Sequence, residues 1–150
     1  MSKRDILLHA DAIQKTYLLG RYPLHVLKGC SLSIQEGEFV SITGASGSGK
    51  STLMHIMGVL DTPDAGRVMF EGEDLFRRTA TARDRMRNRT FGFVFQFYHL
   101  LPELNILENV LLPLMVGNSI LAWSRSRHAA RKAAEEVIGR VGLTERIHHR

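Results

Sequence analysis

The segment SITGASGSGKSTLMHIMG, residues 41–58, restricts the possible folds of this chain more than any other segment. Its central motif begins at Gly44 and has the pattern G-x-x-x-x-G-K-[ST] of a phosphate-binding loop. The apolar and β-branched residues 39–43 before it predict a buried strand. After it, residues 53–57 carry apolar side chains at helical spacing and are followed by Gly58, which predicts a helix that ends there. The sequence therefore places a glycine-rich loop between a strand and a helix.

Such a loop is suited to anion binding. Its glycines let the backbone curl so that successive N–H groups point at one centre, and the following helix adds the positive end of its dipole. We expect Lys50 to reach the β and γ phosphates of a nucleotide, Ser51 to ligate Mg²⁺ through its hydroxyl, and Thr52 to contact the α phosphate. The predicted nucleotide-binding residues of the loop are Gly44, Ala45, Ser46, Gly47, Ser48, Gly49, Lys50, Ser51 and Thr52. The motif alone does not identify the nucleotide or the reaction.

The remaining elements predict a mixed α/β domain without internal repeats or low-complexity linkers. Further strands are expected at residues 6–17, 26–34, 67–72 and 91–95, and further helices at residues 79–88, 106–115 and 126–140. Asn105 and Glu108 have the spacing of a capping box at the start of the second of these helices. One face of the last helix is expected to be apolar through Ala130, Ala133, Ala134, Val137, Ile138 and Val141.

Composition indicates a soluble globular domain, since 44% of the 150 residues are hydrophobic and 23% are charged. The single cysteine, Cys30, excludes an internal disulfide and favours a reducing cytoplasm. The N-terminal residues 1–13 make a poor secretory signal because their apolar run is short and stops at Asp11. The most apolar region, residues 106–123, is interrupted by polar residues and a proline, so a membrane role would require a partner.

Two blocks of sequence, GASGSGKSTLMHIMGVLDTPDAGRVMFEGEDL and FGFVFQFYHLLPELNILENVLLPL, resemble the nucleotide-binding subunits of ATP-binding cassette (ABC) transporters. Within that family they look most like the bacterial lipoprotein-releasing and macrolide-export branch. The similarity extends from about residue 7 to residue 150. It implies an α/β fold of the P-loop nucleoside triphosphatase class, in which residues 1–150 form the N-terminal two-thirds of a single ABC-type ATP-binding domain.

The resemblance implies roles for three residues outside the loop. Tyr17 would be the aromatic residue that stacks on the adenine of ATP, and Val26 would contact the ribose or the base. Gln96 falls at the family's Q-loop glutamine, which contacts Mg²⁺ and the attacking water, so we expect it to act in catalysis and in metal binding.

The resemblance also implies partners. Residues 97–103, which begin at Phe97 and end at Glu103, would face the coupling helix of a transmembrane permease subunit through exposed apolar side chains. The complete protein would form a homodimer of ATP-binding subunits, cytoplasmic and held on the inner face of the membrane by the permease. ATP hydrolysis would then drive export or lipoprotein release.

Several parts of the family pattern are absent from these 150 residues. There is no LSGGQ-type signature, no Walker B strand ending in Asp-Glu and no switch histidine. Asp61 follows an apolar run but lies in a turn too soon after the loop to belong to Walker B. We therefore expect this chain by itself to bind nucleotide weakly and not to turn it over, because the Walker B carboxylate that would serve as general base for hydrolysis is missing.

Two other functional classes follow from different features. The net charge is +5, and many basic residues fall in two runs, residues 77–89 and 125–132. A basic nucleic-acid-binding module would show salt-dependent binding that is indifferent to Lys50→Ala. A P-loop small-molecule kinase would use the arginines of the first run as lid residues, although the resemblance of residues 91–113 argues against this. We interpret the basic runs as solvated helix surface and do not expect a nucleic-acid partner.

Overall fold

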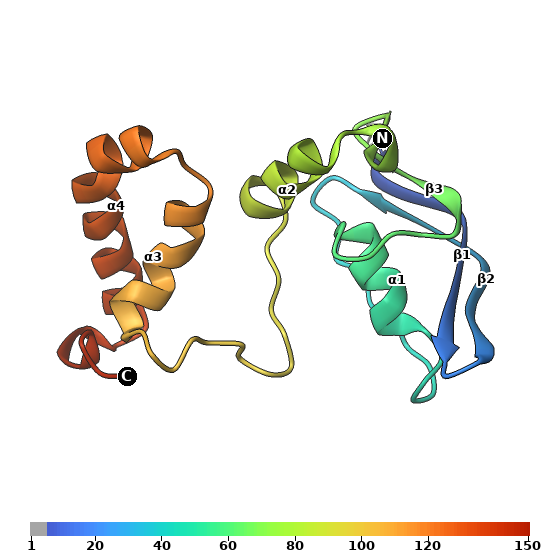
Figure 1. Cartoon of the computed structure of the whole chain (residues 1–150), viewed down its shortest axis with the longest axis horizontal. Helices are drawn as coiled ribbons and strands as arrows, with labels where there is room; N and C mark the ends of the chain where they lie inside the picture. The colour runs from blue at the N-terminus through green and yellow to red at the C-terminus, as the bar shows by residue number, and fades with distance from the viewer. Residues whose placement is uncertain (1–5) are drawn as a thin grey trace. The chain divides into compact units, whose positions relative to one another are not determined.

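The computed structural model describes residues 6–150 and divides the chain into two compact units, residues 1–87 and residues 88–150. Figure 1 shows the elements of both units, coloured along the chain. Residues 1–5, which include the basic Lys3 and Arg4, lie outside the described part.

The first unit is built on a four-stranded antiparallel sheet with the order β2-β1-β3-β4 (Figure 1). Its strands are β1 (Ile6–Leu19), β2 (Tyr22–Gln35), β3 (Ala65–Phe70) and β4 (Glu73–Asp74). β1 and β2 form one long hairpin in which Leu19 is paired with Tyr22. The strands predicted at residues 6–17, 26–34 and 67–72 are confirmed, and β2 begins four residues before its predicted start.

Helix α1 (Lys50–Met57) packs against β1 and β2 and supplies much of the buried surface of the first unit. Its apolar spacing places Leu53, Ile56 and Met57 on the buried face, and the helix ends at Gly58 as predicted. The buried apolar residues of the three longer strands are Ala10, Ile13, Leu27 and Val68. The phosphate-loop motif is therefore joined to a helix that the sheet holds in place.

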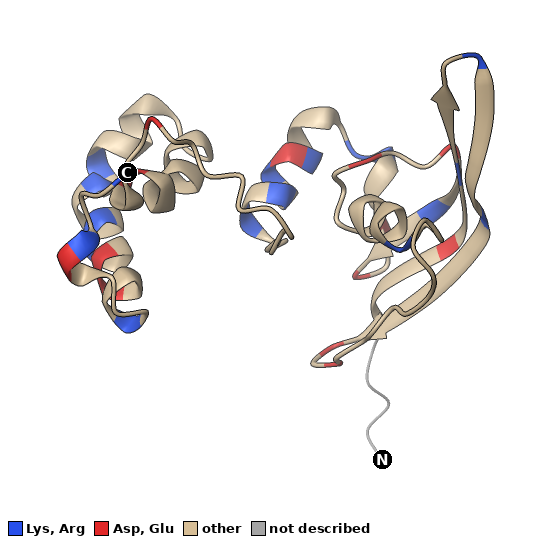
Figure 2. Cartoon of the chain, turned by 90° about the horizontal axis from the view of Figure 1, so that it is seen from below, with Lys and Arg blue, Asp and Glu red and all other residues tan. Residues whose placement is uncertain are grey.

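The basic run after β4 forms the 3-10 helix η1 (Leu75–Arg77) and helix α2 (Ala80–Arg89), as predicted. Lys and Arg dominate the charged residues of α2 (Figure 2). Several of these arginines have local partners: Arg78 pairs with Glu73, and Arg87 pairs with Asp84 and also donates to the Val59 carbonyl. These contacts are consistent with a solvated helix surface.

Two strand predictions are wrong. Residues 39–43 and residues 91–95 have no strand structure, and Phe39 and Val94 are fully or almost fully exposed, at 95% and 103%. An apolar β-branched run forms a strand only where neighbouring strands accept its backbone hydrogen bonds. Among residues 6–150 the sheet consists of β1 to β4, and none of these pairs with either segment.

The second unit contains helices α3 (Ile106–Val116) and α4 (Ile120–Arg140) and the 3-10 helix η2 (Thr144–Arg146). Its core consists of Leu107, Leu111, Ala134 and Ile138, surrounded by the partly buried Ile106, Trp123, Ala130, Leu143 and Ile147. The predicted capping box of α3 is confirmed, with Asn105 and Glu108 each accepting a backbone N–H of the other. The N–H groups of Ile106 and Leu107, which have no partner within the helix, donate to the carbonyls of His149 and Ile147.

Helix α4 differs from its prediction in two respects. It begins six residues earlier, at Ile120, because the Ser119 side chain accepts the Ala122 N–H and caps it. Its buried face is also narrower, since Val137 and Val141 are exposed. In the described part of the chain, no helix has both the length and the apolar character needed to cross a bilayer.

Candidate functional site

The phosphate-loop motif forms a curled turn that leads directly into α1. Gly49 is the N-cap residue of this helix and has a φ of 89°, in the left-handed region. A Cβ atom at this position would lie 2.9 Å from Cδ2 of Leu27 and 3.1 Å from Cγ1 of Val26, so glycine lets the loop pass close to β2. The helix start has no side-chain cap and no acidic residue in its first turn. Its free N–H groups and positive dipole end are therefore available to an anion.

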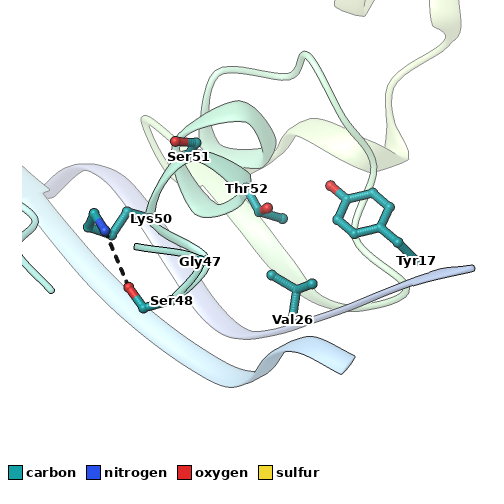
Figure 3. A pocket seen from close by; sticks show the side chains of 8 residues that line it. Tyr17, Val26, Gly47, Ser48, Lys50, Ser51 and Thr52 are labelled. Atoms are coloured by element: carbon teal, nitrogen blue, oxygen red, sulfur yellow. Dashed lines mark hydrogen bonds between the residues drawn. The ribbon is translucent and has the colours of Figure 1, made fainter. Parts of the chain in front are cut away.

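Lys50 lies across this turn. Its Nζ atom donates hydrogen bonds to the carbonyl oxygens of Gly44, at 2.9 Å, and Ala45, at 2.7 Å. It also lies 3.5 Å from Oγ of Ser48, the contact drawn in Figure 3. The ammonium group is thus kept inside the loop by uncharged acceptors. Because no carboxylate among residues 6–150 forms an ion pair with it, it can exchange these carbonyls for phosphate oxygens.

A cavity of about 300 Å³ lies beside the loop (Figure 3). Its lining residues are Tyr17, Val26, Gly47, Ser48, Gly49, Lys50, Ser51 and Thr52. All of them were predicted from the sequence to bind nucleotide, and they come from β1, β2, the loop and α1. Figure 3 shows Val26 between the loop and the ring of Tyr17. The cavity therefore has a polar end at the loop and an apolar and aromatic end at the strands.

Tyr17 is fixed at its end of the cavity by the turn that follows α1. Its hydroxyl donates to Oδ2 of Asp61 at 2.6 Å, and Nζ of Lys15 donates to Oδ1 of the same carboxylate at 2.8 Å. The Lys15 ammonium also lies over the Tyr17 ring, 5.1 Å from its centroid. Burial and the bond to Asp61 raise the pKa of the Tyr17 hydroxyl, so it remains a hydrogen-bond donor at neutral pH.

The Lys15–Asp61 pair is partly shielded from water, with side-chain exposures of 11% and 29%. Burial alone raises the pKa of Asp61, but hydrogen bonds from Lys15, Tyr17 and the Thr62 backbone outweigh it and lower that pKa. Burial alone lowers the pKa of Lys15, but Asp61 outweighs it and raises that pKa. Both shifts favour the charged pair.

These shifts predict how the stability of the first unit depends on pH. The contribution of Asp61 to the free energy of unfolding is present above the ordinary pKa of the side chain, about 3.9, and is lost as the pH falls through its lowered pKa. The contribution of Lys15 is present below its ordinary pKa, about 10.4, and is lost as the pH rises through its raised pKa. Wild type should therefore exceed Asp61→Asn in unfolding free energy by a constant amount between about pH 5 and pH 9, and the difference should shrink in stronger acid. Urea unfolding followed by the amide signals of β1 checks this. A difference that persists unchanged to pH 2 would contradict it.

Other predicted residues do not line the cavity. Gly44, Ala45 and Ser46 belong to the same loop, and two of them contribute the carbonyls that hold Lys50. Gln96 is exposed and belongs to the second unit, whereas the cavity belongs to the first, so its role in metal binding and catalysis stays a prediction.

Sequence reasoning missed Lys15 and the contribution of Asp61 to the site. Asp61 was considered only as a Walker B candidate, and its contact with Tyr17 spans 44 positions of sequence. A local signal did exist. The turn DTPD, residues 61–64, places two carboxylates shortly after α1. Both accept hydrogen bonds from β1: Asp61 as described above, and Asp64 from the backbone N–H of Thr16 at 2.7 Å.

Comparison with known proteins shows the family to which the chain belongs. The sequence model of the family described as "ABC transporter" matches residues 27–150. The chain is 45% identical to the lipoprotein-releasing system ATP-binding protein LolD 2 of Rhodopirellula baltica over 99% of its own length, and 46% identical to LolD of Geobacter metallireducens over 96%. It spans 58% and 61% of the lengths of these relatives.

A solved structure shows the same fold. The dimeric post-hydrolysis state of the ATP-binding cassette MJ0796, bound to ADP and Pi, matches with a TM-score of 0.80 and 38% identity. The match covers 95% of this chain and 60% of that one. The predicted α/β class of the P-loop nucleoside triphosphatases is thereby confirmed. With a family match over most of its length, the chain belongs to the ABC transporter family and has the fold of its ATP-binding cassette.

Proposed function

We propose that the chain binds Mg-ATP in the cavity beside the phosphate loop. One observation carries this proposal: the cavity joins an uncapped helix start and the Lys50 ammonium at one end to the Tyr17 ring at the other. A nucleotide has the same order of groups, with anionic phosphates at one end and an aromatic base at the other. ATP supplies the phosphoanhydride whose hydrolysis drives transport, and the residues of this chain bind and orient it.

Each residue of the cavity has a role that suits its chemistry. Lys50 would contact the β and γ phosphates as a point charge, and Thr52 would contact the α phosphate. The Tyr17 ring offers a surface for stacking the base, and Val26 offers an apolar contact beside it. Ser51 is exposed at the loop, where its hydroxyl would serve as a ligand of Mg²⁺. For Gln96, which belongs to the second unit, a role toward Mg²⁺ rests on the family resemblance alone.

In the complete protein we propose that ATP hydrolysis is coupled to a transmembrane permease and drives lipoprotein release or export. The names of the relatives support the lipoprotein-releasing branch. Residues 97–103 would be the docking segment, because Phe97, Tyr98 and Leu100 are 72%, 88% and 65% exposed. Asn109 holds the end of this segment on α3 through bonds to the backbone of Leu101.

The family also suggests an assembly and a location. The ATP-binding cassette MJ0796 has been solved as a dimer, and we propose a homodimer for the complete protein here. It would be cytoplasmic and held at the inner face of the membrane by the permease. The 150-residue chain by itself would bind nucleotide without ordinary turnover, since its sequence lacks the Walker B carboxylates and the signature motif.

Calorimetric titration of the chain with Mg-ATP and with AMP tests the proposed site. Mg-ATP should bind and AMP should bind much more weakly, because most of the binding energy comes from the β and γ phosphates. Phosphate release from the same samples should stay at the level of a blank. Failure to bind Mg-ATP by a folded chain would reject the site, whereas hydrolysis at an ordinary enzymatic rate that is lost in Lys50→Ala would reject only the absence of turnover.

Salt-dependent DNA binding that Lys50→Ala leaves unchanged would favour the nucleic-acid class instead.

A further inference from the structure

We propose that Asp61 and Lys15 are positioning residues that hold the Tyr17 ring ready for the base of the nucleotide. This inference rests on the proposed function. Asp61 does not line the cavity itself, and it acts on the site through its hydrogen bond with the hydroxyl of Tyr17, which does line it. The loop would then recognise the phosphates, and the Asp61–Lys15 pair would determine how well the base is bound.

The carboxylate of Asp61 is itself fixed from three sides. Lys15 and Tyr17 each bind one of its oxygens, and the Thr62 N–H donates to Oδ1 at 2.7 Å. The Lys15 ammonium also donates to the Thr62 carbonyl at 2.6 Å, which ties the turn to β1 at a second point. A tyrosine whose hydroxyl is bound to such an anchor has lost most of its rotamer freedom before any ligand arrives.

The Lys15 ammonium lies over one face of the Tyr17 ring. A base that stacks on this ring would therefore use the opposite face. Tyr17 is 37% exposed and lines the cavity, so part of its surface is accessible to a ligand. Without the pair, the exposed ring would rotate among several positions, and ordering it on binding would reduce the affinity for the nucleotide.

The test compares two ligands that share the phosphates but differ in the base: Mg-ATP and Mg-tripolyphosphate. Asp61→Ala and Tyr17→Phe should each weaken Mg-ATP binding about 3- to 10-fold and change Mg-tripolyphosphate binding by less than about 2-fold. Tyr17→Phe keeps a ring for stacking and removes the hydroxyl, which is bound by Asp61 and also interacts with the side chain of Thr52. The double variant should be no weaker than the worse single variant, because both break the same hydrogen bond.

Asp64→Ala is the matched control. It removes the same charge from the same turn, but its carboxylate binds the Thr16 backbone and not Tyr17, so the ratio of the two affinities should stay at the wild-type value. Equal weakening of both ligands by Asp61→Ala would show a merely structural role and would overturn the inference, as would additive effects in the double variant. A wild-type chain that binds neither ligand would instead overturn the proposed function, and the inference with it. A Tyr17→Ala variant that loses more Mg-ATP affinity than Tyr17→Phe would support stacking on the ring.

Discussion

Replacing Lys50 with alanine is expected to weaken Mg-ATP binding by about 10- to 100-fold, since a hydrogen bond to a charged group contributes about 1.5–3 kcal/mol. The residue lines the cavity, and in the described part of the chain its ammonium is held by carbonyls and a hydroxyl of the loop. A ligand with several negative charges would replace these weak acceptors with charged ones. Calorimetric titration gives the change in affinity directly.

The matched control for this change is Lys28→Ala. Lys28 is an exposed residue of β2 in the same unit and does not line the cavity. Both variants lose one positive charge, so they alter the long-range field of the unit to a similar extent. Affinities of Lys50→Ala and Lys28→Ala that fall by the same factor would mean that net charge, and not contact with the phosphates, attracts the nucleotide. We expect Lys28→Ala to lie within about 2-fold of wild type at physiological salt, where exposed charges are screened beyond about 8 Å.

The loop could be predicted from the sequence because its conformation is decided locally. The left-handed backbone at position 49 favours glycine, and the residues that follow it form a helix by their own apolar spacing. The capping box of α3 is equally local, since Asn105 and Glu108 are three positions apart. Features of this kind need no knowledge of the rest of the fold.

Strands depend on their partners, and this is why two strand predictions failed. Residues 39–43 and 91–95 have the composition of buried strands, but a strand is stabilised by hydrogen bonds to neighbours that can lie anywhere in the sequence. The same limitation concealed the anchor of Tyr17. Asp61 is distant from Tyr17 in sequence, and only the antiparallel return of the chain from α1 into β3 brings its carboxylate beside β1.

Substitution of Gly66 by alanine is expected to destabilise the first unit by about 2–4 kcal/mol. Gly66 lies in β3 with a φ of 92°, opposite the irregular part of β1. A Cβ atom there would lie 2.5 Å from the carbonyl oxygen of Asp11 and 2.6 Å from that of Ala12. Both are backbone atoms, so the strands themselves would have to separate. Urea unfolding followed by the amide signals of β1 measures the loss.

Gly72→Ala separates the close approach from the backbone conformation. Gly72 follows β3 in the same hairpin and has a φ of 81°, but nothing lies within 4 Å of the Cβ position. Gly72→Ala should lower the free energy of unfolding only by the cost of placing alanine in the left-handed conformation, about 1–2 kcal/mol. Equal losses in the two variants would mean that the contact between β1 and β3 does not account for Gly66. A larger loss in Gly66→Ala should also reduce the preference for Mg-ATP over Mg-tripolyphosphate, because the turn that carries Asp61 is attached to β1 immediately before β3 begins.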